Sequence, residues 1–153
     1  MYELRPYQTE AKNAVLSEWE QGHKKTLLVL PTGCGKTVVF ASVTEEQVHK
    51  GHRVLIMAHR GELLTQASDK LKEASGLDSV LEKAESSSFG SFVPVTVGSV
   101  QSLCQEKRLD RFPQDYFQDI VVDEAHHALS DSYQRVLEHF PDANVLGVTA
   151  TPD

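Results

Sequence analysis

The stretch Leu27-Leu28-Val29-Leu30-Pro31-Thr32-Gly33-Cys34-Gly35-Lys36-Thr37 combines an apolar run, a glycine-containing turn and the start of a helical pattern. The consecutive aliphatic residues at 27–30 predict a buried strand. Gly33 and Gly35 allow the backbone to bend so that successive N–H groups point inward at an anion. A helix that begins at Lys36 adds the partial positive charge of its N-terminus. The stretch therefore predicts a strand, a phosphate-binding loop and a helix, in that order.

The same alternation of strand and helix continues along the chain. Further buried strands are predicted at 54–57, 93–97, 120–122 and 145–148, and residues 78–82 are open to another. Helical patterns separate them at 7–20, 36–49, 62–74 and 132–140. The strands are short and continuously apolar, as expected when both faces of a sheet are covered. We therefore predict an α/β fold, a three-layer sandwich with a mostly parallel sheet and right-handed crossovers.

Composition and charge narrow the class of protein. The chain has 153 residues, 40% of them hydrophobic and 24% charged, which fits one globular domain. Its net charge of −7 makes it a poor candidate for purely electrostatic binding of nucleic acid. No apolar run approaches the roughly 20 residues of a membrane helix, and the N-terminus lacks the pattern of a signal peptide. We expect a cytoplasmic protein, nuclear in a eukaryote, with no membrane partner.

The phosphate-binding loop has a specific chemistry. Lys36 can reach the β- and γ-phosphates of a nucleotide, and the Thr37 hydroxyl can ligate Mg²⁺. Pro31, Thr32 and Cys34 complete the loop around its two glycines. The general pattern asks for glycine where Leu30 stands, so we interpret the loop as a variant whose turn comes one step later.

A pair of carboxylates follows a later strand. The apolar run 120–122 leads directly into Asp123 and Glu124. The carboxyl ends of the strands are where ligands bind in α/β proteins. Asp123 would hold Mg²⁺, largely through its water shell, and Glu124 would orient and deprotonate an attacking water. The implied cofactors are ATP and Mg²⁺.

These runs, in this order, resemble the motifs of the first RecA-like lobe of superfamily 2 helicases and translocases. Asp123-Glu124-Ala125-His126 resembles the DEAH box. Four further segments resemble the adenine-recognition motif, motif Ia, the TxQSL motif and motif III, namely 4–8, 58–66, 99–103 and 149–152. Ser99 replaces the usual threonine of the TxQSL motif. The opening and closing motifs look most like the branch that contains type III restriction subunits and excision-repair helicases.

The resemblance implies an ATP hydrolase and assigns roles around the nucleotide. Lys36, Asp123, Glu124 and His126 are its catalytic set. Gln8 would pair with adenine, since a glutamine amide matches adenine N6 and N7. Arg5 would stack on the base, although a surface arginine is an equal alternative. His126 would link the DEAH box to the hydroxyls of motif III, with a satisfied core histidine as the alternative.

The resemblance also implies contacts to nucleic acid and coupling between the motifs. Coupling would use Thr149 and Thr151. Polar residues at strand ends and helix starts suit phosphate contacts that position a strand without reading its bases. Each of them has helix capping or solvation as its alternative: His59, Arg60, Gln66, Ser99, Gln101 and Ser102.

The same resemblance implies the domain organisation. Residues 1–153 would form the helicase ATP-binding lobe, and the second RecA-like lobe is absent from the chain, which ends directly after motif III. We expect a nucleic acid, DNA rather than RNA, and that second lobe as partners. The alternative is a stand-alone P-loop module that switches a protein partner. Glu124 argues against this alternative, since a pure binding module needs no water-activating base.

Overall fold

The computed structural model describes residues 6–31, 36–58, 64–82, 93–123, 125 and 130–151. The helices are α1 Pro6–Glu20, α2 Lys36–His49, α3 Leu64–Ser75, α4 Val100–Leu103, α5 Glu106–Leu109 and α6 Asp131–His139. The strands are β1 Lys25–Pro31, β2 Val54–Ala58, β3 Val80–Glu82, β4 Val95–Ser99, β5 Asp119–Asp123 and β6 Asn144–Thr151. None of the helices in these ranges is long and apolar enough to cross a membrane.

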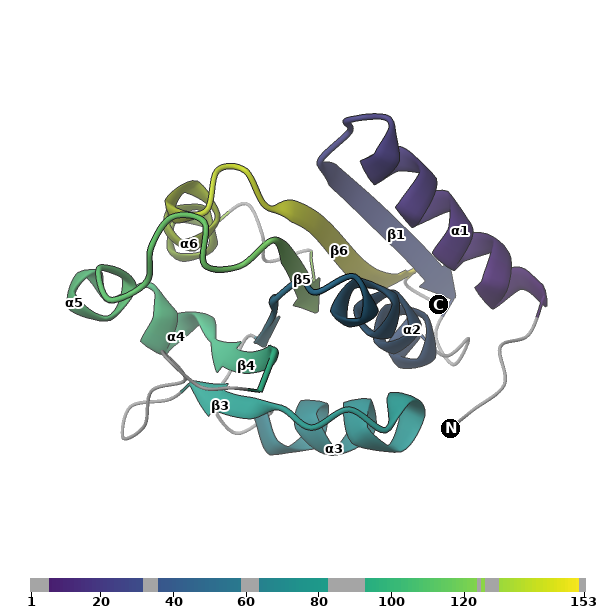
Figure 1. Cartoon of the computed structure of the whole chain (residues 1–153), viewed down its shortest axis with the longest axis horizontal. Helices are drawn as coiled ribbons and strands as arrows, with labels where there is room; N and C mark the ends of the chain where they lie inside the picture. The colour runs from purple at the N-terminus through teal and green to yellow at the C-terminus, as the bar shows by residue number, and fades with distance from the viewer. Residues whose placement is uncertain are drawn as a thin grey trace.

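The strands form one parallel sheet in the order β1-β6-β5-β2-β4-β3 (Figure 1). The register is continuous across its centre, where Val122 aligns with Met57 on one side and with Gly147 on the other. This sheet confirms the predicted parallel α/β sandwich. It also shows that the segment 78–82, which the sequence left open, contains a strand, β3.

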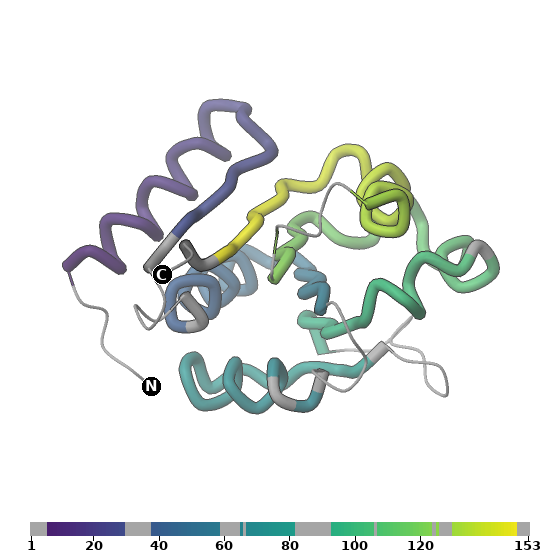
Figure 2. The backbone as a smooth tube through the Cα atoms, turned by 180° about the vertical axis from the view of Figure 1, so that it is seen from behind, coloured from purple at the N-terminus to yellow at the C-terminus, as the bar shows by residue number. Residues whose placement is uncertain are grey.

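Helices cover both faces of the sheet, with α1, α2 and α3 on one side and α4, α5 and α6 on the other (Figures 1 and 2). Alternate residues of β2 divide between the two cores. Val54, Ile56 and Ala58 pack with the first three helices, whereas Leu55 and Met57 pack with the last three. This alternation explains why β2 is apolar throughout, because every one of its side chains is buried.

Two details of the sequence prediction are wrong. The run 27–30 was expected to be buried, yet Leu27 is 61% and Val29 45% exposed, because β1 is the edge strand of the sheet. No helix was predicted in the segment 107–116, between the predicted strands at 93–97 and 120–122. It contains part of α5 and buries Leu109 and Phe112 in the second core, where Phe112 packs against other aromatic rings.

Gly147 in the middle of β6 permits a close approach to the segment after β5. A Cβ atom at this position would lie 2.9 Å from the Ala125 Cβ and 3.3 Å from the Leu27 Cδ1. We expect Gly147→Ala to lower the free energy of unfolding by about 1–3 kcal/mol, the usual cost of overpacking a tight site. Urea denaturation measures the change, with Ser132→Ala on the exposed side of α6 as the control. An unchanged unfolding midpoint in Gly147→Ala would contradict this packing.

Candidate functional site

The carboxyl ends of the parallel strands meet at one edge of the sheet. β1 ends at Pro31, which aligns with Thr151 of β6, and Asp123 at the end of β5 aligns with Val148. β6 therefore separates the end of β1 from the end of β5 by one strand. This edge brings together three of the segments that the sequence singled out, although they are far apart along the chain.

The predicted phosphate-binding loop lies between β1 and α2. The strand ends at Pro31 and the helix begins at Lys36 and Thr37, so the predicted order of strand, turn and helix is confirmed on both sides. The residues between them, Thr32, Gly33, Cys34 and Gly35, lie outside the described part of the chain. The N-terminus of α2 therefore sits at the carboxyl edge of the sheet, where its partial positive charge favours an anion.

β5 is a central strand that delivers Asp123 to the same edge. Its first four residues are buried, whereas Asp123 is partly exposed. A carboxylate at this place is a hard oxygen ligand of the kind that Mg²⁺ prefers, and the hydroxyl of the predicted second ligand, Thr37, is another. The residue types therefore fit Mg²⁺, and the site remains a prediction. Glu124 and His126 lie outside the described residues, so their predicted roles remain predictions.

Ala125 shows how the chain continues beyond β5. Its side chain is buried and packs in the second core. The close approach to Gly147 holds Ala125 against β6, the strand that also carries Thr149. Thr149 is partly exposed and Thr151 is the last residue of β6. The segment resembling the DEAH box and the segment resembling motif III are thus neighbours, as the coupling hypothesis requires.

Gln8 lies in the first turn of α1 and is only 5% exposed. Burial is unusual for a glutamine, and it shows that this side chain faces inward rather than into bulk solvent. Arg5, the other residue predicted to contact the base, lies outside the described residues.

The residues predicted to contact nucleic acid are placed unequally. Ser99 is 2% exposed, and its hydroxyl accepts a hydrogen bond from the backbone N–H of Ser102, so it caps α4 as one of the two alternatives proposed. Ser102 is also buried, whereas Gln101 is exposed. Gln66 lies in α3, while His59 and Arg60 are outside the described residues. Among Ser99, Gln101 and Ser102, whose side chains the structure describes, Gln101 is the exposed one.

Sequence reasoning missed the surroundings of two residues, Gly147 beside Ala125 and Asp119 at the amino end of β5. Gly147 interrupts an apolar run and was taken for an ordinary strand residue, although an isolated glycine in a strand is a signal of close backbone approach. Asp119 begins β5 and is 1% exposed. A charged residue directly before an apolar run is common at strand starts, so nothing local in the sequence marked it as buried.

The fold and the site together define a RecA-like nucleotide-binding domain of the P-loop class. More specifically, the chain belongs to the family described as "Type III restriction enzyme, res subunit", whose sequence model matches residues 1–153. This match confirms the resemblance to the first RecA-like lobe of superfamily 2 helicases and translocases.

Curated relatives agree with this assignment. The chain is 35% identical over 157 residues to the "Putative mitochondrial ATP-dependent helicase irc3" of Schizosaccharomyces pombe, covering 97% of this chain and 26% of the relative. It is 30% identical to the "DNA 3'-5' translocase XPB2" of Sulfurisphaera tokodaii, covering 99% of this chain and 31% of the relative. The chain thus spans about a quarter to a third of these proteins, and their names give no support to the protein-switch alternative.

Solved structures confirm the fold. The UvsW helicase of bacteriophage T4 superposes with a TM-score of 0.77 at 19% identity, covering 97% of this chain and 52% of that one. The Hef helicase domain of Pyrococcus furiosus gives a TM-score of 0.78 at 22% identity, covering 98% and 34%.

Proposed function

We propose that this chain is the ATP-binding lobe of a nucleic-acid-dependent ATPase that moves on DNA or RNA. The observation that carries the proposal is the meeting of the β1–α2 junction and Asp123 at one edge of a single parallel sheet. This arrangement puts a phosphate-binding helix start and a metal-binding carboxylate within reach of one nucleoside triphosphate. The family assignment supports ATP as that nucleotide.

Each residue of the site has a separate task in this proposal. The loop Pro31–Gly35 cradles the phosphates with its backbone N–H groups, and Lys36 neutralises the β- and γ-phosphates. Thr37 and Asp123 would hold Mg²⁺, which neutralises charge on the phosphate oxygens when bound. Glu124 orients a water and accepts its proton, while His126 relays the state of the site to Thr149 and Thr151.

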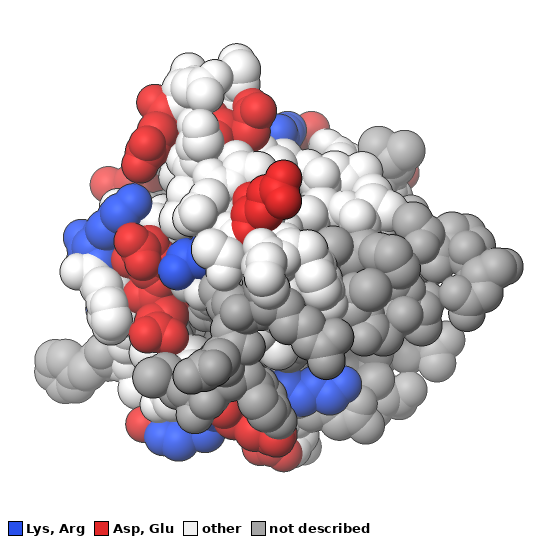
Figure 3. Space-filling view, turned by 90° about the vertical axis from the view of Figure 1, so that its right-hand side faces the viewer, with Lys and Arg blue, Asp and Glu red and all other residues white. Residues whose placement is uncertain are grey.

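The partner that we propose is a nucleic acid, with DNA favoured over RNA. The support is the naming of one relative as a DNA translocase. The exposure of Gln101 at the carboxyl edge of the sheet supports contact with a nucleic-acid strand of either kind. Acidic and basic residues are interspersed in the described part of the face in Figure 3, so binding would depend on local contacts rather than on net charge. A second RecA-like lobe would complete the nucleic-acid binding surface. The protein would act in the cytoplasm or, in a eukaryote, in the nucleus.

Calorimetric titration of residues 1–153 with ATP and ADP in the presence of Mg²⁺ tests the proposal. We expect both nucleotides to bind with one-to-one stoichiometry. A folded chain that releases no heat with either nucleotide would contradict the proposed function.

A second prediction concerns the choice of base. If Gln8 pairs with the adenine edge, GTP leaves a buried amide unpaired, because guanine presents O6 where adenine presents N6–H₂. An unpaired buried polar group costs about 1–3 kcal/mol, which corresponds to about 5- to 150-fold in affinity. ATP should therefore bind tighter than GTP by this factor, and Gln8→Ala should remove most of the difference. Competition binding measures it, with Gln21→Ala after α1 as the control, and equal affinities in the wild type would refute the pairing.

A further inference from the structure

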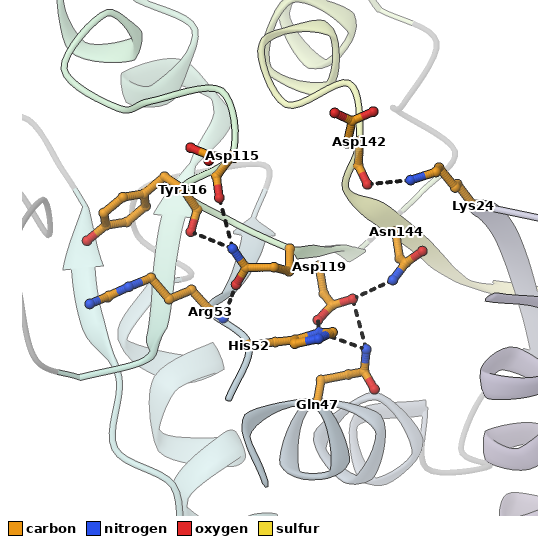
Figure 4. A network of polar contacts seen from close by, with 10 residues as sticks. Lys24, Gln47, His52, Arg53, Asp115, Tyr116, Asp119, Asp142 and Asn144 are labelled. Carbon is orange, nitrogen blue, oxygen red and sulfur yellow. Dashed lines mark hydrogen bonds and ion pairs between the residues drawn. The ribbon is translucent and has the colours of Figure 1, made fainter. Parts of the chain in front are cut away.

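A polar cluster lies at the amino edge of the sheet, opposite the candidate site (Figure 4), and within it Asp119 and Gln47 are buried whereas His52 and Asn144 are partly exposed. The carboxylate of Asp119 is its centre. Oδ1 accepts hydrogen bonds from Gln47 Nε2 and Asn144 Nδ2, both at 2.9 Å, and Oδ2 accepts one from His52 Nδ1 at 2.7 Å. We call these four residues the Asp119 cluster. It joins the end of α2, the turn before β2 and the first residues of β5 and β6.

The chemistry of the carboxylate fixes the orientation of its partners. An ionised carboxylate only accepts, so Gln47 must present its amide nitrogen and His52 must carry a proton on Nδ1. Gln47 leaves its own Oε1 buried and without a hydrogen-bond partner among the described residues. An unpaired buried oxygen is costly, and here it accompanies the bond to Asp119. The orientation of the Gln47 side chain therefore satisfies Asp119, although it leaves the amide oxygen of Gln47 without a hydrogen bond among the described residues.

Three of the joined elements carry candidate site residues at their other ends. α2 begins with Lys36 and Thr37, β5 ends at Asp123, and β6 carries Thr149. The distance along each element is similar: about 16 Å from Gln47 back to Lys36, and about 13 Å along β5 and about 16 Å along β6. The Asp119 cluster thus joins α2, β5 and β6 at one end, and the opposite ends of these three elements carry the residues of the proposed nucleotide site.

α2 depends on this cluster more than the strands do. Ladder hydrogen bonds already fix β5 against β6 and β2. α2 lies on the sheet through apolar side chains such as Phe40, Ala41 and Val43. Apolar contact is non-directional, so it does not by itself fix one hydrogen-bonded arrangement of α2 against β5. The bond from Gln47 to Asp119 gives α2 a directional contact with β5, the strand that ends in Asp123.

We propose that Asp119 is a positioning residue for the nucleotide site, which sets the place of Lys36 and Thr37 relative to Asp123 by holding Gln47. This inference rests on the proposed function. Its consequence concerns Mg²⁺, because the ion needs oxygen ligands from both α2 and β5 at the same time, with near-ideal geometry. Binding of metal-free ATP needs only the loop and the start of α2. The cluster should therefore matter more for Mg²⁺–ATP than for ATP alone.

The test measures ATP affinity with Mg²⁺ and with EDTA, and the ratio of the two is the magnesium gain. Gln47→Met keeps the size of the side chain but removes the donor. We expect it to lower the magnesium gain by about tenfold, the lower end of the effect of changing a residue that hydrogen-bonds a metal ligand directly, because Gln47 acts on Thr37 only through α2. Affinity in EDTA should stay close to that of the wild type.

Two further variants separate positioning from stability. Asp119→Asn can keep all three contacts, since His52 can take its other tautomer and accept from the new amide, so the gain should be retained. Leu71→Ala removes a fully buried side chain of α3 outside the cluster, and it should lower the free energy of unfolding while retaining the gain.

The outcomes distinguish this inference from the proposed function. If the wild type binds no ATP, the proposed function fails and the inference fails with it. If the wild type shows a magnesium gain that Gln47→Met retains, only the inference is overturned. An equal loss of the magnesium gain in Leu71→Ala also overturns the inference, because the effect would then follow stability. A loss of the magnesium gain in Asp119→Asn overturns it as well, because the effect would then follow the charge of Asp119 rather than the Gln47 contact.

Discussion

Lys36→Ala should remove nucleotide binding from this chain while leaving it folded. Lys36 opens α2 at the carboxyl edge of the sheet, where a phosphate would lie. Each charge-assisted hydrogen bond from its ammonium group is worth about 1.5–3 kcal/mol, or about 10- to 150-fold in affinity. Contacts to two phosphates together would take binding below calorimetric detection.

The measurement is titration with Mg²⁺–ATP, and thermal unfolding checks that the variant keeps its fold. Lys70→Ala is the matched control, because Lys70 is exposed on α3, which connects β2 to β3 and is not part of the β1–α2 junction. Unchanged affinity in Lys36→Ala would show that the β1–α2 junction does not hold the phosphates.

Glu124→Gln should separate ATP binding from ATP hydrolysis in the full-length protein. The change keeps the size of the side chain but removes the base proposed to accept a proton from the attacking water. General base catalysis typically contributes about 10²–10⁴-fold, so turnover should fall by this factor while ATP still binds.

Steady-state phosphate release and ATP binding must be measured on the same preparation. Glu138→Gln on the exposed side of α6 makes the same chemical change away from the site and should leave turnover unaltered. Normal turnover in Glu124→Gln would remove this residue from the mechanism.

The sequence was sufficient to predict the parallel sheet because strands buried on both faces are continuously apolar. β2 shows this directly, since all five of its residues are buried. The exposure of Leu27 and Val29 could not be predicted in the same way. It depends on β1 being at the edge, and strand order is a property of the whole sheet rather than of the strand's own composition.

The candidate site and the Asp119 cluster show the same division between local and long-range signals. The β1–α2 junction and the place of Asp123 at the end of β5 were predicted because each motif is contiguous and follows or ends a strand. The Asp119 cluster was missed because its members are distant in sequence: Gln47 is 72 positions from Asp119 and Asn144 is 25. Such contacts appear only when the chain has folded, and nothing in the composition around Asp119 indicates them.

Phosphate release by residues 1–153 and by the full-length protein, with and without single- and double-stranded DNA and RNA, tests the central claim most directly. The claim is that this chain is the ATP-binding half of a two-lobe, nucleic-acid-dependent ATPase. A second lobe would supply the arginine finger, which is worth about 10³–10⁵ in rate in related phosphoryl-transfer systems. We expect trace hydrolysis from residues 1–153, and turnover higher by orders of magnitude and dependent on nucleic acid from the full-length protein. Full nucleic-acid-stimulated turnover by residues 1–153 alone would contradict the account.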